Sequence, residues 1–141
     1  MTSNCVQQLL EVLIEKIVKN DNKIADEVME NLVALFDTEM IEALELLDSD
    51  NVSKIVSNNN CRHIYQVESG EKSKTRPGRY FCLIDANYCS CDHFRKSLSD
   101  DSVLFCKHLI ACKLSIAINS FKTITKTNEE MNDLWTKHIL I

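Results

Sequence analysis

Two close pairs of metal-binding residues constrain this chain more than any other feature of its sequence. Cys89 and Cys91 form the first pair, and fourteen residues separate it from the second pair, Cys106 and His108. A structural Zn²⁺ takes four thiolate or imidazole ligands in a tetrahedron, usually supplied as two close pairs that the fold brings together. We therefore predict one structural zinc ion per chain, bound by these four side chains.

The spacing within each pair also predicts the local backbone. Residues i and i+2 of a strand point to the same side, so Cys89 and Cys91 can face one metal if they end a strand or enter a turn. On a helix the same spacing puts side chains on nearly opposite sides. Cys106 must therefore lie at or just before a helix start, with His108 in the first turn. The apolar run from Leu109 to Ile118 is suited to that buried helix.

Two other residues could replace a member of this set. His93 lies two residues after Cys91, and Cys112 lies one helical turn after His108. We expect Cys112 to belong to the apolar core. We expect His93 to begin a short helix over about residues 92–98 and to face solvent.

Size and composition argue against an enzyme. A chain of 141 residues can form one domain, or one domain with an appendage, but has little room for a separate catalytic domain. Its only glycines are Gly70 and Gly78, so neither a Gly-x-x-x-x-Gly-Lys-Ser/Thr phosphate loop nor a Gly-x-Gly-x-x-Gly turn can form. A catalytic zinc needs an open coordination position, whereas four protein ligands close this one.

The seven cysteines raise the question of compartment. The start of the chain, Met1 to Asn4, lacks the basic region and compact apolar stretch of a signal peptide. No apolar stretch approaches the roughly 20 residues that span a bilayer. We therefore expect reduced thiols, a cytosolic or nuclear protein and no membrane partner. Packing roles are expected for the three cysteines without a close partner in the sequence, namely Cys5, Cys61 and Cys82.

Charge is distributed unevenly over a chain whose net charge is −5. The first fifty residues hold twelve of the 21 acidic side chains, so this half should repel phosphates. Basic residues cluster in a loop and near the predicted zinc ligands: Lys72, Lys74, Arg76, Arg79, Arg95, Lys96 and Lys107. The cluster is small and has few aromatic residues for base stacking, which favours a solvated hairpin tip and helix surface over a DNA contact.

The N-terminal region, residues 1–50, is predicted to be helical. Apolar residues recur at three- and four-residue intervals over about residues 4–19 and again from Ile24 to Phe36. A third amphipathic helix follows, with Asp37 or Thr38 as its N-cap.

The periodicity then changes to that of strands. β-branched residues and Tyr predict strands over Val52–Val56, Arg62–Glu68 and Arg79–Asp85. The polar segment Ser69–Gly78 joins the last two and holds the only proline, which predicts a long, mobile hairpin loop. These strands, the metal site and the apolar helix make up a zinc module over residues 51–120.

A final helix is predicted within residues 121–141. Thr127 and Glu130 form a capping-box signature, and apolar residues follow at helical spacing. The single tryptophan, Trp135, should pack on the chain's own core or anchor an interface. The predicted fold class is α+β, with N-terminal helices, a small antiparallel sheet or hairpin, and a zinc module closed by a buried helix.

The order of these features resembles the SWIM zinc finger. Its signature is a strand-rich lead-in, Cys-x-Cys after Tyr88, a variable stretch, and Cys-x-His on an apolar helix with the small Ala111 behind the His. The segment Ala43–Asp48 and the strand Arg62–Val67 extend the likeness over roughly residues 30–118. Over that length the chain is similar to the zinc finger SWIM domain-containing protein 7 family, the SWIM subunits of Shu-type recombination complexes.

That resemblance implies a non-enzymatic, nuclear adaptor in homologous recombination DNA repair. Members of the family pair with a RecA-like recombinase paralogue, in a heterodimer or larger complex, and the pair promotes recombinase filaments on single-stranded DNA. Contact with single-stranded DNA is then expected mainly through the complex. The surplus of apolar helix surface separately indicates a protein partner. The alternative is a direct single-stranded nucleic-acid-binding zinc module that uses the Lys72–Arg79 loop and Arg95 with Lys96.

Overall fold

A computed structural model of the chain describes residues 3–68, 78–91 and 106–139. The predicted hairpin loop, except Gly78, and the predicted short helix over residues 92–98 lie outside the described residues. Within the described residues the α+β class is confirmed, with helices and a mixed five-stranded sheet.

The three predicted N-terminal helices are all present. They are α1 (Ser3–Lys19), α2 (Asp26–Phe36) and α3 (Thr38–Asp48). Asp37 separates the last two: its N–H donates to the Val33 carbonyl at 2.7 Å and ends α2, and α3 begins at the next residue. Asp37 therefore holds the predicted N-cap position, although its side chain makes no capping hydrogen bond.

Five strands form one sheet in the order β4-β3-β2-β1-β5. Their bounds are Val52–Ser57 for β1, His63–Glu68 for β2, Arg79–Leu83 for β3, Tyr88–Cys89 for β4 and Lys122–Lys126 for β5. The strands β1 to β4 pair in antiparallel fashion, as predicted, and β5 runs parallel to β1.

The strand β5 corrects the prediction for the C-terminal region, where we expected a helix alone. Its sequence, Lys-Thr-Ile-Thr-Lys, is rich in β-branched residues but almost wholly exposed. It therefore lacks the apolar alternation that marks a half-buried strand. The neighbouring strand determines the pairing, with Ser53 opposite Lys122 and Ser57 opposite Lys126.

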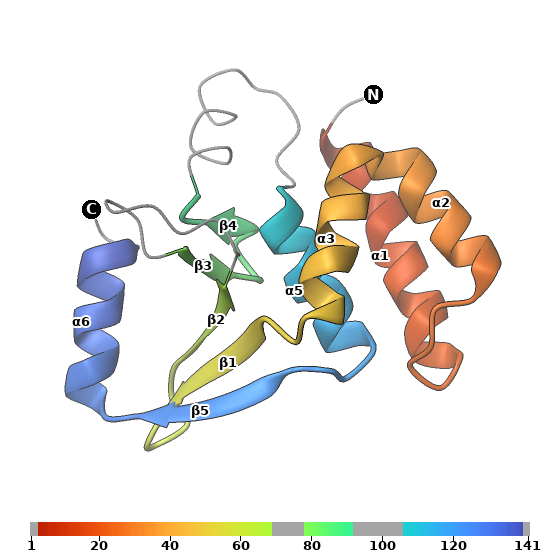
Figure 1. The fold of residues 1–141 in the computed structure, drawn as a ribbon. Coiled ribbons are helices and arrows are strands. Elements are labelled where there is room, and N and C mark those ends of the chain that lie inside the picture. The colour runs from red at the N-terminus through yellow and green to blue at the C-terminus, as the bar shows by residue number, and fades with distance from the viewer. Residues whose placement is uncertain (1–2, 69–77, 92–105, 140–141) are drawn as a thin grey trace.

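Helices cover the sheet on both faces (Figure 1). On one face α5 (Lys107–Ala117) lies between the sheet and the N-terminal helices, and on the other face lies α6 (Asn128–His138). Because side chains alternate along a strand, the strands β1, β2 and β3 each contribute to both layers. Tyr65 and Cys82 pack into the core with α5, whereas Ile64 and Phe81 pack against Met131 of α6.

The helix α5 is the centre of the larger core. Eight of its eleven residues are buried, which confirms the predicted buried helix. A helix that is apolar on nearly all sides needs neighbours all round. The sheet and the helices α1 and α3 provide them.

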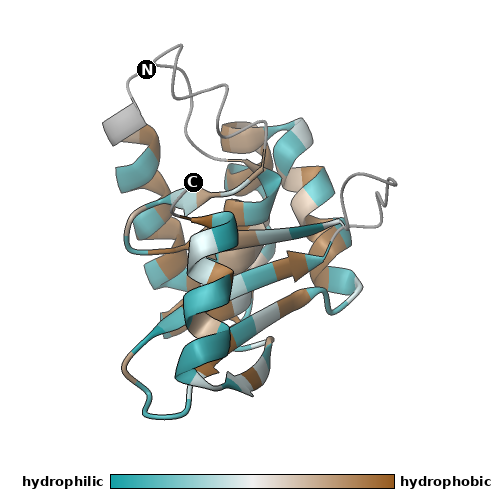
Figure 2. Ribbon diagram, turned by 90° about the vertical axis from the view of Figure 1, so that its left-hand side faces the viewer, coloured by the Kyte–Doolittle hydropathy of each residue, from teal (hydrophilic) through white to brown (hydrophobic). Residues whose placement is uncertain are grey.

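The helix α6 is held to the sheet by polar as well as apolar contacts. Its capping box is confirmed, because Thr127 accepts from the Glu130 N–H at 3.1 Å and donates its own N–H to the Glu130 carboxylate at 3.0 Å. Arg62 donates to Asn132 Oδ1 at 2.8 Å, and Trp135 packs on the smaller core cluster. The exposed side of α6 is mainly hydrophilic (Figure 2).

No helix within the described ranges is both long and apolar enough to span a bilayer.

Candidate metal centre

The four predicted ligands meet between the end of β4 and the start of α5. Cys89 is the last residue of β4 and Cys91 follows in the turn, while Cys106 is the N-cap of α5 and His108 lies in its first turn. The predicted backbone at both pairs is therefore confirmed. The four ligand atoms all lie within 4.8 Å of one another. A tetrahedral zinc site with bonds of about 2.0–2.3 Å needs separations of about 3.5–4 Å between ligand atoms, so small side-chain adjustments suffice.

Backbone pairing with β3 holds the first pair in place. Cys89 lies opposite Cys82 in the β3–β4 register. Ser90, between the two ligands, donates its N–H to the Phe81 carbonyl at 3.0 Å, and its hydroxyl oxygen accepts from the Phe81 N–H at 3.0 Å. The middle residue of the Cys-x-Cys pair is thus bonded to Phe81 of β3 through both its backbone and its side chain, which fixes the direction of the two flanking thiols.

The start of α5 positions the second pair. Cys106 has an extended backbone, with φ −86° and ψ 167°, and its carbonyl accepts the first helical hydrogen bond from Ile110 at 3.1 Å. Cys106 is therefore outside the regular helix, in which successive side chains are rotated by about 100° around the axis. Because the backbone is extended at Cys106 and helical at His108, these two side chains can point to the same metal although they are two residues apart.

The cluster is buried, and its imidazole has no hydrogen-bond partner among the described residues. The exposed fractions are 0 % for Cys89, 4 % for Cys91, 2 % for Cys106 and 4 % for His108. Neither ring nitrogen of His108 makes a hydrogen bond with a described residue. An unpaired buried polar group costs about 1–3 kcal/mol. A metal ion bound to one of these nitrogens would relieve part of that cost.

The environment disfavours free thiolates. Hydrogen bonding with the Cys89 thiol, then with Cys91, and then burial raise the pKa of Cys106 far above its usual range. Zn²⁺ binds the thiolate form and stabilises it by its own charge. The cluster could therefore hold one zinc ion, with four protein ligands and no open position.

The other candidate ligands lie elsewhere. Cys112 is fully buried within the core of α5 and is not part of the cluster, as expected. His93 lies outside the described residues. The packing role predicted for Cys82 is confirmed by its complete burial, but Cys5 and Cys61 are exposed, so the prediction was wrong for both.

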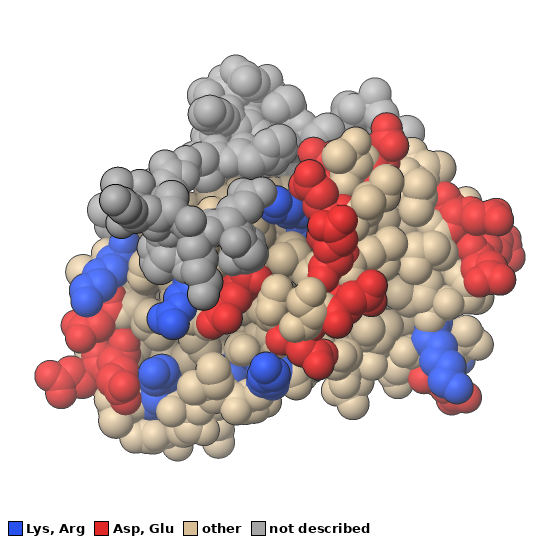
Figure 3. All heavy atoms as spheres, viewed as in Figure 1, with Lys and Arg blue, Asp and Glu red and all other residues tan. Residues whose placement is uncertain are grey.

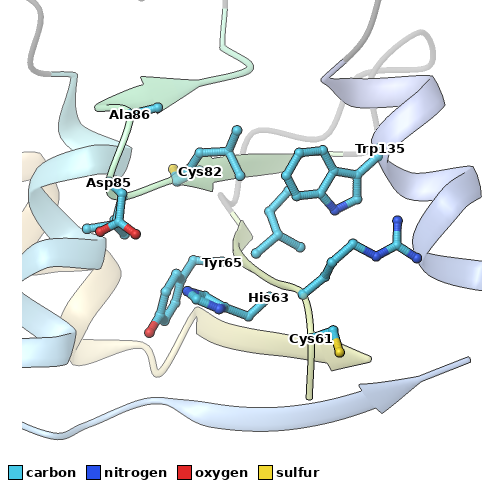
Figure 4. A pocket seen from close by; sticks show the side chains of 11 residues that line it. Cys61, His63, Tyr65, Cys82, Asp85, Ala86 and Trp135 are labelled. Carbon is cyan, nitrogen blue, oxygen red and sulfur yellow. The ribbon is translucent and has the colours of Figure 1, made fainter. Parts of the chain in front are cut away.

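A hollow of about 300 Å³ beside β2 offers metal-binding residue types but no second centre (Figure 4). Cys61 and His63 come from the β2 side, Cys82 and Asp85 from β3 and the turn after it, and Trp135 from α6. Figure 4 shows these side chains spread around the hollow rather than directed at one point. Among the described residues, only the buried four-residue cluster brings such side chains close enough to hold a metal.

Sequence analysis missed one residue that contacts the site. The ring of Tyr80 lies against that of His108, with centroids 4.2 Å apart. A signal was present, because Tyr80 is two residues before Cys82 on the same strand and so shares its face. The pairing of β3 with β4 was needed to place that face next to the metal ligands.

A short strand that supplies Cys-x-Cys and a buried helix that begins with Cys-x-His define a zinc-finger protein of the SWIM class. No protein-family model matches the chain. It is 36 % identical over 128 residues to the zinc finger SWIM domain-containing protein 7 homolog of Dictyostelium discoideum, covering 87 % of this chain and 77 % of that protein. It is 34 % identical over 118 residues to zinc finger SWIM domain-containing protein 7 of Mus musculus, covering 83 % and 74 % of the two chains.

The protein of that name from Homo sapiens is 34 % identical over 119 residues, which cover 83 % of this chain and 80 % of the human one. The chain therefore belongs to the zinc finger SWIM domain-containing protein 7 family. The resemblance found in the sequence is confirmed at the level of the family.

Proposed function

We propose that this chain is a nuclear, non-enzymatic adaptor subunit of a Shu-type complex in homologous recombination DNA repair. It pairs with a RecA-like recombinase paralogue, and the pair promotes assembly of recombinase filaments. The partner binds ATP and makes most phosphate contacts, because this chain has too few glycines for a phosphate loop. Its own zinc is structural.

The observation that carries the proposal is the closed, buried Cys89, Cys91, Cys106 and His108 cluster in a member of this family. Four protein ligands leave no coordination position for a substrate or for an activated water, which catalytic zinc requires. The cluster joins the end of β4 to the start of α5. Zinc at this point would fix the sheet relative to the central helix and so give a rigid surface for docking.

The charges of the described residues support an adaptor over a direct nucleic-acid-binding module. Two of the seven basic residues in the predicted cluster are described, Arg79 after the loop and Lys107 beside a zinc ligand. Arg79 Nε lies 3.7 Å from a Glu68 carboxylate oxygen, and Lys107 Nζ lies 3.6 Å from one of Glu42. A cation already beside a carboxylate contributes less to phosphate binding. Lys72, Lys74, Arg76, Arg95 and Lys96 lie outside the described residues.

The test is to measure binding of labelled single-stranded DNA at near-physiological salt by the purified chain and by the chain co-expressed with a RecA-like paralogue. We expect tight binding by the pair and none by the chain alone. Tight binding by the chain alone, abolished by charge reversal at Lys72, Lys74 and Arg76, would instead support the direct-binding module.

A further inference from the structure

We propose that a groove between α1 and α2 is the surface on which the RecA-like partner docks, through an amphipathic helix that carries Lys or Arg beside its apolar residues. The identity of the partner rests on the proposed function. The surface and the chemistry of the contact are inferred from the groove itself.

The groove has a volume of about 380 Å³ and an apolar floor. Leu9, Val12 and Leu13 of α1 line it on one side, and Ala34 and Leu35 of α2 line it on the other. The apolar positions are three and four residues apart on α1, which is the spacing of ridges that receive another helix. The short side chain of Ala34 leaves room for a large apolar side chain from the occupant. A helix that presents anchors at i, i+3 or i+4, and i+7 fits such a surface.

Two apolar residues of this groove, Leu9 and Val12, are left exposed by the described part of the chain, whereas Leu13 belongs to the buried core. Leu9 exposes 45 % of its surface and Val12 exposes 51 %. Among the described residues, five large hydrophobic side chains are 36 % or more exposed. Three of the five, Leu9, Val12 and Val18, lie on α1. Val18 lies on the opposite side of α1 from Leu9, so only Leu9 and Val12 share the groove, where two adjacent exposed apolar side chains mark an interaction surface more clearly than a single one does.

Charge determines which helix fits. The first fifty residues hold twelve acidic side chains and three lysines. Glu27 and Glu30 lie one helical turn before Asn31 and Ala34 of the groove, and neither has an ion partner among the described residues. Figure 3 shows acidic side chains over α2 and α3, and most of the visible Lys and Arg over the sheet. An occupant with Lys or Arg beside its apolar face complements this half of the molecule.

The same charges disfavour a second copy of this chain as the occupant. Two grooves facing each other would bring two strongly acidic helical regions together, and like charges across an interface are unfavourable. Lys16, at one end of the groove, adds a single positive charge. An acidic residue on the partner helix opposite Lys16 would set the direction in which that helix lies.

The test uses each RecA-like paralogue of the same genome that has a Gly-x-x-x-x-Gly-Lys-Ser/Thr loop, co-expressed one at a time with this chain. Affinity is then measured on the purified components for three variants. Val12→Asp introduces a charge into the groove, and Ala34→Phe fills it while keeping it apolar. Ile41→Asp is the matched control, since Ile41 on α3 is 52 % exposed and lies outside the groove. Zinc content and circular dichroism show that each variant is folded.

We expect Val12→Asp and Ala34→Phe each to weaken the pair at least tenfold, and Ile41→Asp to bind like the wild type. Replacing Glu27 and Glu30 with Lys should slow association and reduce its dependence on salt. Wild-type affinity in both groove variants would overturn the docking site while leaving the proposed function intact. So would a chain that dimerises alone through this groove. If no paralogue binds the wild type, the proposed function fails as well.

Discussion

The rings of Tyr80 and His108 lie against each other, with centroids 4.2 Å apart and planes inclined by 31°. Tyr80 comes from β3, which contributes no ligand, and His108 comes from the first turn of α5. This contact joins the sheet to the one imidazole of the cluster. It holds the ring in one orientation and covers one of its faces, as residues around a metal ligand commonly do.

We predict that Tyr80→Ala lowers the stability of the zinc-loaded protein by about 1–2 kcal/mol, because an aromatic pair and its buried area are lost. The variant should also release zinc to a chelator faster than the wild type. Tyr80→Phe keeps the ring and is the control, so it should resemble the wild type in both respects. Urea unfolding and chelator competition measure the two effects. Unchanged zinc release in Tyr80→Ala would show that the contact does not position the ligand.

A second prediction concerns the metal itself. Elemental analysis should find about one zinc per chain, and His108→Ala or Cys89→Ser should lose both metal and soluble fold. The expected effect is large because structural zinc contributes about 10 kcal/mol or more of apparent binding free energy. Cys112→Ala is the control that separates loss of a metal ligand from loss of a buried thiol, since Cys112 is as buried as the ligands but lies outside the cluster. That variant should be less stable than the wild type and still hold zinc. Full zinc retention in both ligand variants would contradict the assignment.

Much of the site could be predicted because metal ligands impose strong local rules. A Cys-x-Cys pair needs an extended backbone and a Cys-x-His pair needs a helix start, and residues 89, 91, 106 and 108 meet both requirements. The amphipathic helices could be predicted for a similar reason, since each buries one stripe of regular period. In both cases the information lies within a few neighbouring residues.

The strand β5 and the contact of Tyr80 depend on distant parts of the chain. β5 forms because the edge of β1 is available to pair with it, and nothing in its own exposed residues shows this. Tyr80 reaches His108, 28 positions further along the sequence, because α5 packs on one face of the sheet. For Cys61 the prediction was wrong because it relied on residue type alone. Cysteines are commonly buried, but Cys61 lies just before β2 and is exposed to solvent.

A third prediction tests how α6 is fixed. Thr127→Ala removes the hydroxyl that accepts from the Glu130 N–H at the start of α6, keeps the backbone N–H that donates to the Glu130 carboxylate, and should cost about 1 kcal/mol. Thr125→Ala is the matched control, because Thr125 is exposed on β5 and caps no helix. It should cost only a few tenths of a kcal/mol through β-propensity. Thermal or urea unfolding of the two variants measures the difference. Equal losses would mean that the capping box contributes nothing measurable.

The last prediction concerns pH and the far end of α6. The ring of His138 lies against Phe81 with centroids 4.3 Å apart, and the His138 carbonyl accepts from the Tyr88 hydroxyl at 3.3 Å. Burial, and then the charge of Lys137, lower the pKa of His138 below its ordinary value of 6.5. The folded state thus holds this proton less tightly than the unfolded state. Well above pH 6.5 both states are neutral, and the stabilising contribution of the neutral ring is complete.

As the pH falls below 6.5, the unfolded state takes up the proton first, so the free energy of unfolding decreases until the pH passes the lowered pKa of His138. The effect should be modest because the ring is only partly buried. Acid also protonates the zinc ligands, so the wild type alone cannot isolate it. His138→Phe keeps an aromatic ring against Phe81 and cannot titrate. Its loss of stability between pH 7.5 and 5.5 should be smaller than that of the wild type. Equal losses in the two proteins would show that His138 does not contribute to the acid sensitivity of the fold.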